Sequence, residues 1–545
     1  MNFMINESAQ KLRGGYYTPL DIASFISRWV LSNGSSHILE PSCGDGAFLT
    51  AIGQQQQKTI ATVTAFELDF FEAAKASSAA AAANVAANVV NSDFLEWALD
   101  RITHKEKLQF DAVVGNPPFI RYQYLPEKFQ SLSEAIFDNL NCKFTKHTNA
   151  WVPFVLASLA LLKPGGRLAM VLPSEIIHVL HAQSLRTQLS LECRKIVIID
   201  PEEIWFEGTL QGAIILMLEK KKGDEPSEGL GLIPVQGRDF LLEDPSAVFD
   251  NVKPISGSTI SAKWTRAFLG AETLELLEKI EKNNHVYRFK KIAKVDVGIV
   301  TGANKFFLVD DATVVANRLH QWAHPMFGRS EHCPGVIYDK RQHDVNKTAG
   351  LPANFLWFPE GAAREHLEVA RYVTKGESDL LHTRYKTRIR RSWYTVPSVY
   401  TSEIGMLKRS HNAPRLILNE AGAFTTDTAY RIKSLTIPAS QLVASFVNPL
   451  TALSAELEGR TYGGGVLELV PSEIERLLIP ISDQIELDLN ELDTIIRHRS
   501  MQDAIQIYGQ KVLRSIGLSD IEISIIFDGW IQLKNRRQRI SGSEE

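Results

Sequence analysis

The chain has 545 residues, of which 44% are hydrophobic and 22% charged, as in ordinary globular proteins with two to four domains. The formal net charge of −4 excludes a globally basic nucleic-acid binder, so any DNA contact must rely on local patches. No apolar run approaches the roughly 18 residues of a membrane span, and no signal peptide is apparent. The four cysteines are scattered, which indicates neither a metal site nor disulfides, and we expect a cytoplasmic protein.

The first predicted element is a helix that starts at Thr18 and Pro19. Thr18 can cap the helix, and Pro19 suits the first helical position. Apolar residues from Ile22 to Trp29 then recur at helical spacing. The alanine-rich stretch 73–87 is predicted to be a further helix, because alanine is the strongest helix former.

Apolar runs that alternate with helical patterns predict a doubly wound sheet. The seven predicted strands are 37–39, 62–66, 88–92, 110–115, 167–172, 195–200 and 212–218. The expected fold class is therefore α/β, with a Rossmann-like seven-stranded domain over residues 1–220.

Acidic residues stand at the ends of the first three predicted strands, namely Glu40, Glu67 and Asp93. A turn with two glycines follows the first strand. Ligands of open parallel sheets bind beyond the carboxyl ends of the strands. A carboxylate after the second strand could accept hydrogen bonds from ribose hydroxyls, and one after the third from an adenine amino group. A single such acid would be read as a solvated strand end, but three in register with a Gly-x-Gly turn predict a ligand site.

The fourth strand leads into Asn116-Pro117-Pro118-Phe119. Two prolines fix two φ angles and remove two backbone donors, which predicts a rigid extended corner. An Asn amide and a neighbouring carbonyl can both accept from one exocyclic amino group, while the aromatic ring stacks on a flat heterocycle. The corner thus predicts methyl transfer to an amino nitrogen. The alternative is a tight Asn-Pro turn capped by a core phenylalanine.

In this order the motifs resemble those of the adenine-N6 DNA methyltransferases of restriction–modification systems, in their gamma arrangement. The matching stretches are Gly15-Tyr16-Tyr17-Thr18-Pro19, Glu40-Pro41-Ser42-Cys43-Gly44-Asp45-Gly46, Glu67, Asp93, Asn116-Pro117-Pro118-Phe119 and Trp205-Phe206. The resemblance covers about the first 220 residues. Many relatives carry Tyr where this chain has Phe119, which preserves stacking but not the hydroxyl.

The resemblance implies S-adenosylmethionine as the methyl donor and a flipped adenine in duplex DNA as the acceptor. The implied catalytic residues are Asn116, Pro117 and Phe119, with Phe119 and Phe206 stacking on the target base. The implied cofactor-binding residues are Tyr17, Thr18, Pro19, Glu40, Ser42, Gly44, Gly46, Glu67, Asp93, Phe94 and Asn116. No metal is implied.

Single residues distinguish adenine-N6 methylation from cytosine methylation at C5 or N4. Cytosine-C5 enzymes need a nucleophilic cysteine, usually after proline, and the chain has no Pro-Cys pair. Cytosine-N4 enzymes usually carry Ser at the position of Asn116. Two other functions share the corner or the fold, and they stay open: an N-methyltransferase acting on RNA or on a protein glutamine, and a non-catalytic DNA-binding scaffold.

The second half predicts DNA recognition. We expect a connecting segment over 221–285 that includes a helix at 273–282, a mixed α+β target-recognition domain over 286–480, and a helical C-terminal region over 481–545. The glycine-punctuated stretch 297–307 resembles the start of recognition domains in related enzymes, or else forms a plain β-hairpin. The stretch 460–469 also resembles a family sequence but receives no chemical role.

The strongest basic patch interleaves cations with aromatics, as a DNA-contact surface would; its predicted DNA-binding residues are Arg384, Lys386, Arg388, Arg390, Arg391 and Trp393. A solvated basic edge strand is the alternative. The basic stretch 534–539 either touches the DNA backbone or keeps the chain end soluble. Because no nuclease constellation is apparent, the expected partners are double-stranded DNA and a separate restriction endonuclease.

Overall fold

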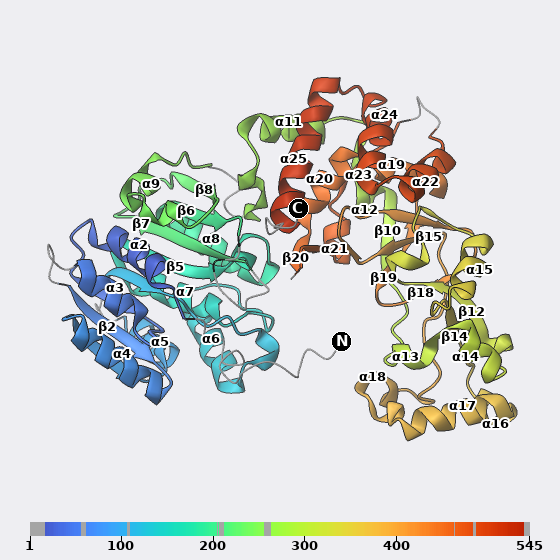
Figure 1. The fold of residues 1–545 in the computed structure, drawn as a ribbon, viewed down its shortest axis with the longest axis horizontal. Helices are drawn as coiled ribbons and strands as arrows, with labels where there is room; N and C mark the ends of the chain where they lie inside the picture. The colour runs from blue at the N-terminus through green and yellow to red at the C-terminus, as the bar shows by residue number, and fades with distance from the viewer. Residues whose placement is uncertain are drawn as a thin grey trace. The chain divides into compact units, whose positions relative to one another are not determined.

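The computed structural model describes residues 17–55, 61–105, 110–203, 205, 212–255, 263–462, 464–482 and 487–538. The chain divides between Phe268 and Leu269 into two compact units (Figure 1). This division lies inside the predicted connecting segment 221–285, and the predicted domain limits stay predictions. In the described part of the chain no helix combines the length and apolarity needed to cross a membrane.

The first unit is built on one large mixed sheet in the order β3-β2-β1-β4-β5-β7-β6-β8. Its strands are β1 (His37–Glu40), β2 (Thr62–Glu67), β3 (Ala86–Asn91), β4 (Phe110–Gly115), β5 (Leu162–Pro173), β6 (Cys193–Pro201), β7 (Ala213–Lys220) and β8 (Gly229–Val235). The prediction of seven strands is wrong by one. Strand β8, placed in the predicted connector, pairs in parallel with β6. Strand β7 runs antiparallel to both β5 and β6.

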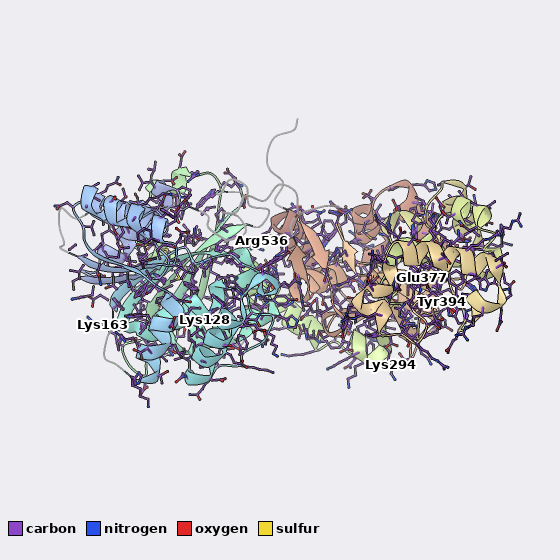
Figure 2. The ribbon with its side chains drawn as sticks, turned by 90° about the horizontal axis from the view of Figure 1, so that it is seen from below. Lys128, Lys163, Lys294, Glu377, Tyr394 and Arg536 are labelled. Atoms are coloured by element: carbon purple, nitrogen blue, oxygen red, sulfur yellow. The ribbon has the colours of Figure 1, made fainter. Side chains whose placement is uncertain are left out.

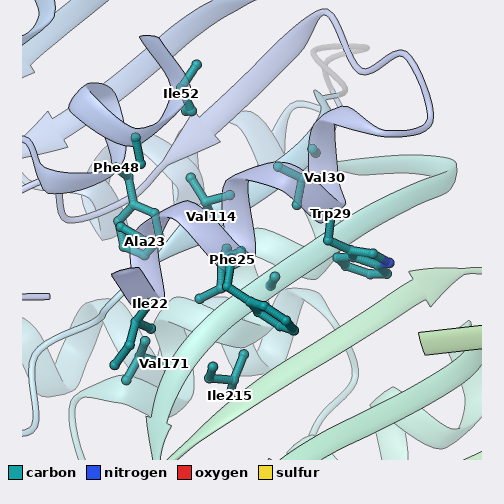
Figure 3. Close-up of a cluster of buried hydrophobic side chains, with 14 of the residues drawn as sticks. Ile22, Ala23, Phe25, Trp29, Val30, Phe48, Ile52, Val114, Val171 and Ile215 are labelled. Carbon is teal, nitrogen blue, oxygen red and sulfur yellow. The ribbon is translucent and has the colours of Figure 1, made fainter. Parts of the chain in front are cut away.

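Helices α2 (Leu20–Leu31) and α3 (Ala47–Gln55) cover one face of this sheet. Figure 3 shows Phe25 and Trp29 of α2 beside Val114, Val171 and Ile215 of the strands. All five side chains are buried. Each contributes roughly 1.5–3 kcal/mol on burial, so the helical stripe predicted from the sequence is what holds α2 against the sheet.

Other helices of the unit are α4 (Phe70–Ala82), α5 (Phe94–Thr103), α6 (Glu127–Asn139), α7 (Trp151–Leu161), α8 (Gln183–Glu192) and α9 (Pro245–Asn251). Helix α4 begins three residues before the predicted stretch 73–87, because Asp69 caps it by accepting from the backbone N–H of Phe71 and Glu72. It ends at Ala82, so the end of that prediction is wrong: Ala86 and Ala87 already belong to β3. Helix α7 is buried on nearly every side and packs against α5.

The second unit combines four small sheets with helices. Its strands are β9 (Val286–Arg288), β10 (Ala293–Val297), β11 (Leu308–Val309), β12 (Ala323–Phe327), β13 (Ile337–Tyr338), β14 (Asn354–Leu356), β15 (Ile404–Leu407), β16 (Arg409–Ser410), β17 (Leu416–Asn419), β18 (Phe424–Thr425), β19 (Ala429–Ser434), β20 (Arg460–Tyr462), β21 (Val466–Glu468) and β22 (Leu478–Pro480). The largest sheet has the order β10-β19-β15-β17-β13. This mixed α+β architecture agrees with the predicted class.

Its longer helices are α11 (Ala271–Glu281), α15 (Lys340–Thr348), α17 (Leu367–Ser378), α19 (Ala439–Phe446), α20 (Pro449–Glu458), α22 (Leu489–His498) and α25 (Asp520–Gln538). Helix α11 confirms the helix predicted at 273–282. Helices α22 and α25, with the shorter α24 (Gly509–Arg514) between them, confirm a helical C-terminal region in the described residues.

For two stretches in the second unit, the structure excludes the alternative that the sequence left open. The stretch 297–307 is no plain hairpin, because β10 ends at Val297 and helix α13 (Asn304–Phe307) follows. Gly298 is required there, since a Cβ atom would lie 2.0 Å from the carbonyl oxygen of Thr426. The basic stretch is no edge strand either: helix α18 (Tyr385–Arg388) opens it, and an irregular segment follows.

The glycine-rich stretch is the turn of the hairpin β20–β21, with Gly464 and Gly465 at φ values of 77° and 66°. The third glycine, Gly463, lies outside the described residues. A Cβ atom on Gly465 would lie 2.7 Å from the Cα atom of Gln538, so this glycine lets α25 pass close to the turn. The stretch without a sequence-based role thus has a packing role.

Arg537 on α25 is buried, so this residue of the basic stretch 534–539 has neither of the roles that the sequence suggested, DNA contact or solubility. Its guanidinium pairs with Glu456 of α20 at 2.8 Å, and the two side chains are 2% and 3% exposed. It also donates to the carbonyl oxygens of Gly465 and Asn412. Arg537 therefore joins α25, α20 and the glycine turn through one charged group.

Candidate active site

The proline corner lies at the end of β4, and two other predicted segments meet it. The Nδ2 atom of Asn116 donates to the hydroxyl of Thr18 over 3.1 Å. The hydroxyl of Ser42 donates to the backbone carbonyl of Asn116 over 3.2 Å. Pro117 is buried, and Phe119 packs partly against the core. Three stretches far apart in sequence are thus brought together around one amide.

The structure corrects the predicted role of Thr18 as a helix cap. Pro19 occupies the N-cap position of α2, and no side chain caps this helix. The Thr18 hydroxyl accepts from Asn116 instead. This contact orients the amide, because its nitrogen faces Thr18 and its Oδ1 atom is the acceptor.

The turn after β1 is held against the end of β2. The backbone N–H of Cys43 donates to the carbonyl of Phe66, and that of Gly44 donates to the Glu67 carboxylate over 3.0 Å. Gly46 has a φ of 93°, and a Cβ atom there would lie 2.9 Å from the Cβ of Ala79. The tight turn therefore needs glycine at this position for both conformation and space.

Glu40 is the most unusual group of this unit. Its side chain is fully buried, and neither carboxylate oxygen has a hydrogen-bond partner among the described residues. Burial raises the pKa of Glu40 well above its usual value, and the nearby acids Asp45 and Glu67 raise it further. A buried carboxylate without a partner is costly, so this site suits a ligand that brings a positive charge.

The other two strand-end acids are held by backbone donors. Glu67 accepts from Gly44 with one oxygen and from Asp69 with the other. Each carboxylate oxygen has a second lone pair, so both can also accept from hydroxyl groups. Asp93 caps α5 by accepting from the backbone N–H of Leu95 over 2.9 Å. Phe94 beside it is buried in the core.

Of two predicted aromatic site residues, Tyr17 and Phe206, the structure describes only Tyr17. Tyr17 is exposed beside Thr18. Phe206 lies outside the described residues, so its predicted stacking on a target base stays a prediction. Its neighbour Trp205 is buried in the core cluster of the first unit.

The predicted DNA-contact residues of the second unit fall into two groups. Arg384, Lys386, Arg388 and Arg391 are exposed. Arg390 instead donates to the carbonyl oxygens of Val300 and Thr301. Trp393 is buried and donates to Glu377, which Figure 2 labels.

Of the exposed members, Arg384 directly precedes α18, Lys386 and Arg388 lie on it, and Arg391 lies in the irregular segment after it. Lys386 and Arg391 line a surface hollow of about 500 Å³. The ring of Tyr385, itself exposed, has both Lys386 and Arg388 within 6 Å of its centre, at 5.7 and 5.8 Å. An exposed aromatic between two cations is the arrangement that the sequence pattern predicted, although Arg390 and Trp393 serve the fold instead.

Family models match both halves of the chain. The model described as N-6 DNA Methylase matches residues 2–237, and that of the C-terminal domain of the type II methyltransferase M.Eco57I matches residues 261–513. The chain belongs to the N-6 DNA methylase family. This methylase is accordingly a type II DNA adenine-N6 methyltransferase of restriction–modification systems, a family that uses S-adenosylmethionine.

Curated relatives resemble the methylase over most of its length. It is 24% identical over 506 residues to the type II methyltransferase M.AccI of Acinetobacter calcoaceticus, covering 88% of this chain and 86% of the relative. It is 23% identical over 473 residues to M.XamI of Xanthomonas campestris pv. amaranthicola, covering 86% and 85%. Both halves of the methylase therefore have counterparts in these relatives.

A solved structure shares the fold of the methylase. It is a nuclease-deletion mutant of the Type ISP restriction-modification enzyme LlaGI in complex with a DNA substrate mimic, with a TM-score of 0.50 and 13% sequence identity. The match covers 90% of this chain and 55% of that chain.

Two polar residues near the corner escaped the sequence reasoning. Asn149 precedes α7, and Glu175 follows β5. Glu175 could have been found by the rule that selected Glu40, Glu67 and Asp93, because it too stands just beyond a strand's carboxyl end. Asn149 carries no such signal, since it becomes relevant only through contacts with distant segments.

Proposed function

We propose that the corner at Asn116 holds the N6 amino group of an adenine flipped out of duplex DNA, while S-adenosylmethionine lies beyond β1, β2 and β3. The observation that carries the proposal is the contact between Asn116 and Thr18. It fixes the amide so that Oδ1, together with the carbonyl of Pro117, can accept from one amino group. S-adenosylmethionine supplies an activated methyl group on a positively charged sulfur.

The residues of the corner act by position. The lone pair of an adenine amino group is delocalised into the ring, so the nitrogen is a poor nucleophile. Two acceptors in a fixed direction hold its hydrogens and favour a pyramidal, attack-ready nitrogen. The nitrogen becomes acidic once methylated, so no dedicated strong base is needed. Flipping the base costs a few kcal/mol, which stacking on Phe119 and Phe206 partly offsets.

The described residues fit the cofactor. Glu40 supplies a buried negative group for the positive methionine end. In this proposal the other residues around that end are Thr18, Pro19, Ser42, Gly44 and Gly46. Glu67 accepts from the ribose hydroxyls. The Oδ2 atom of Asp93 accepts from the adenine amino group, with Tyr17 and Phe94 completing the set.

The direct test follows the methyl group. Duplex DNA incubated with the protein and radiolabelled S-adenosylmethionine should carry label, and digestion to nucleosides should place it in N6-methyladenine. Sequencing of genomic DNA from expressing cells, with modified-base detection, should then reveal one recognition sequence. Label recovered in cytosine, in RNA or in protein would refute the proposal.

Glu40→Gln should weaken binding of S-adenosylmethionine by about 2 kcal/mol, roughly thirtyfold, because the buried negative charge is lost. In the free protein the raised pKa of Glu40 keeps a proton on the carboxyl to a higher pH than usual. A bound cation favours the ionised form, so cofactor binding should release protons, and affinity should rise with pH through that range.

Calorimetry in two buffers of different ionisation enthalpy measures this release. The wild type should show a buffer-dependent binding enthalpy, and Glu40→Gln should not. The control is Glu96→Gln, whose exposed carboxylate pairs with Lys128. If Glu40→Gln releases as many protons as the wild type, another group pairs with the cation.

We further propose that Arg384, Lys386, Arg388 and Arg391 contact DNA phosphates. The double variant Lys386→Ala/Arg388→Ala should weaken DNA binding. It should also reduce the magnitude of the slope of log affinity against log salt concentration by about two, since each lost phosphate contact reduces that slope by roughly one. The matched control is Lys340→Ala/Arg341→Ala on α15, which removes two exposed cations elsewhere. An equal change of slope in both doubles would mean that this patch has no special role.

The system partner expected from the sequence, a separate restriction endonuclease, belongs to the same proposal. A cleaving enzyme with the recognition sequence that modified-base detection reveals should fail to cut DNA methylated by this protein. Digestion of methylated and unmethylated plasmid measures that protection.

A further inference from the structure

The chain that leaves the proline corner is clamped on either side of Arg121. The carbonyl of Ile120 accepts from the backbone N–H of Ala150 over 3.0 Å. The backbone N–H of Tyr122 donates to the Oδ1 atom of Asn149 over 3.1 Å. The prolines fix the corner itself, but they do not fix the chain beyond Phe119. These two bonds supply that restraint.

Asn149 is nearly fully buried, and its side-chain oxygen is turned to Tyr122 rather than to the start of α7. An asparagine before a helix commonly caps it, yet no side chain caps α7. Because Oδ1 faces a backbone donor, Nδ2 must face the other way. There it donates to the Glu175 carboxylate over 3.0 Å. The amide thus links the corner segment to the segment after β5.

Glu175 is itself held in place. It lies in a short 3₁₀ turn, Ser174–Ile177, directly after β5. Arg186 of α8 is fully buried and donates to the carbonyl oxygens of Ile176 and Val179, each over 2.9 Å. These two hydrogen bonds from the Arg186 guanidinium fix the turn that carries Glu175.

We propose that Asn149 and Glu175 are positioning residues for the methyl-transfer step: they hold the segment after Phe119 so that its ring and the Pro117 carbonyl keep their places against the target adenine. This rests on the proposed function of the corner. Neither residue touches the substrate. A displacement of about 1 Å at reacting groups can cost on the order of a hundredfold in rate, so the clamp is worth a measurable part of catalysis.

The pair can be rebuilt with its roles exchanged. Asn149→Ala removes the acceptor for Tyr122. Asn149→Asp keeps an acceptor but sets a second carboxylate against Glu175. The double variant Asn149→Asp/Glu175→Gln restores both bonds, because the new carboxylate accepts from Tyr122 and the new amide donates to it. A merely structural need for an asparagine would not be met by this exchange.

The full-length protein is tested on two duplexes that carry its recognition sequence. The first has adenine at the target position and gives the single-turnover methylation rate. The second has 2-aminopurine there, which lacks the 6-amino group and reports base flipping alone. Asn149→Ala should lower the rate on the order of tenfold or more and reduce the fluorescence gain, while its affinity for S-adenosylmethionine stays that of the wild type. Asn149→Asp should be impaired at neutral pH and recover as the pH falls, because a shared proton then bridges the carboxylates. The double variant should approach the wild-type rate at both pH values.

The control is Asn139→Ala, which removes an exposed amide that bonds only to its own helix in the described contacts. Wild-type rate and fluorescence in Asn149→Ala would overturn the inference. A double variant as impaired as Asn149→Asp would also overturn it, because restoring both hydrogen bonds would then not restore the rate. Failure of the wild type to methylate adenine would instead refute the proposed function of the corner.

Discussion

Asn116→Ala should abolish most methyl transfer, because we expect it to lower kcat about 10²- to 10³-fold or more. The amide supplies one of two acceptors that hold the adenine amino group, and removal of one fixed polar group at a reacting centre typically costs that much. S-adenosylmethionine binding should change far less, because Glu40 and Glu67 are untouched. Radiolabel transfer at saturating cofactor measures the change in kcat. Calorimetry measures the affinity for the cofactor separately.

Thermal unfolding serves as the control for Asn116→Ala. The side chain is only half-buried, so its loss should leave the fold intact. Asn139→Ala provides a matched variant with an exposed amide remote from the corner in sequence. Normal methylation by Asn116→Ala would mean that the corner is not where the amino group is held.

Arg537→Ala should lower the free energy of unfolding by about 3–5 kcal/mol. The substitution leaves the Glu456 carboxylate buried without its cation, together with the carbonyl oxygens of Gly465 and Asn412. Breaking a buried ion pair on one side typically has this cost. Chemical denaturation followed by fluorescence measures it, with the transition of the second unit as the readout.

The matched control is Arg514→Ala, which breaks an exposed pair with Asp520 whose side chains are 53% and 74% exposed. Its cost should be at most about 1 kcal/mol, because water screens such pairs. Equal effects of the two substitutions would show that α25 is held by something other than Arg537.

Much of the first unit was predictable because strands such as β4, β6 and β7 are largely buried and read as continuous apolar runs. Strand β8 was missed, since the polar stretch 220–229 that leads into it read as a domain connection, and the strand itself contains Pro234. It lies at the edge of the sheet, where proline is tolerated because no partner needs its missing donor. The largely buried strands and one edge strand, β3, were therefore legible, whereas the opposite edge strand, β8, was not.

The site was predictable where one residue type at a strand end carries the signal, as with Glu40, Glu67, Asp93 and the proline corner. It was not where the meaning of a side chain depends on a distant partner. Trp393 and Arg537 carry sequence patterns of DNA contact, yet both are buried. The partner of Arg537, Glu456, lies 81 residues earlier, and no local sequence pattern predicts that the two residues pair.

The place of β7 has a consequence for how the first unit forms during synthesis. Strand β7 lies between β5 and β6, and β6 and β8 join the rest of the sheet only through it. In a nascent chain released from the ribosome tunnel only as far as β6, β5 therefore lacks one of its partners and β6 lacks both. The edges that face β7 stay open to pairing with neighbouring nascent chains until residues 213–220 emerge, so we expect slower translation over this stretch to lower the yield of folded protein.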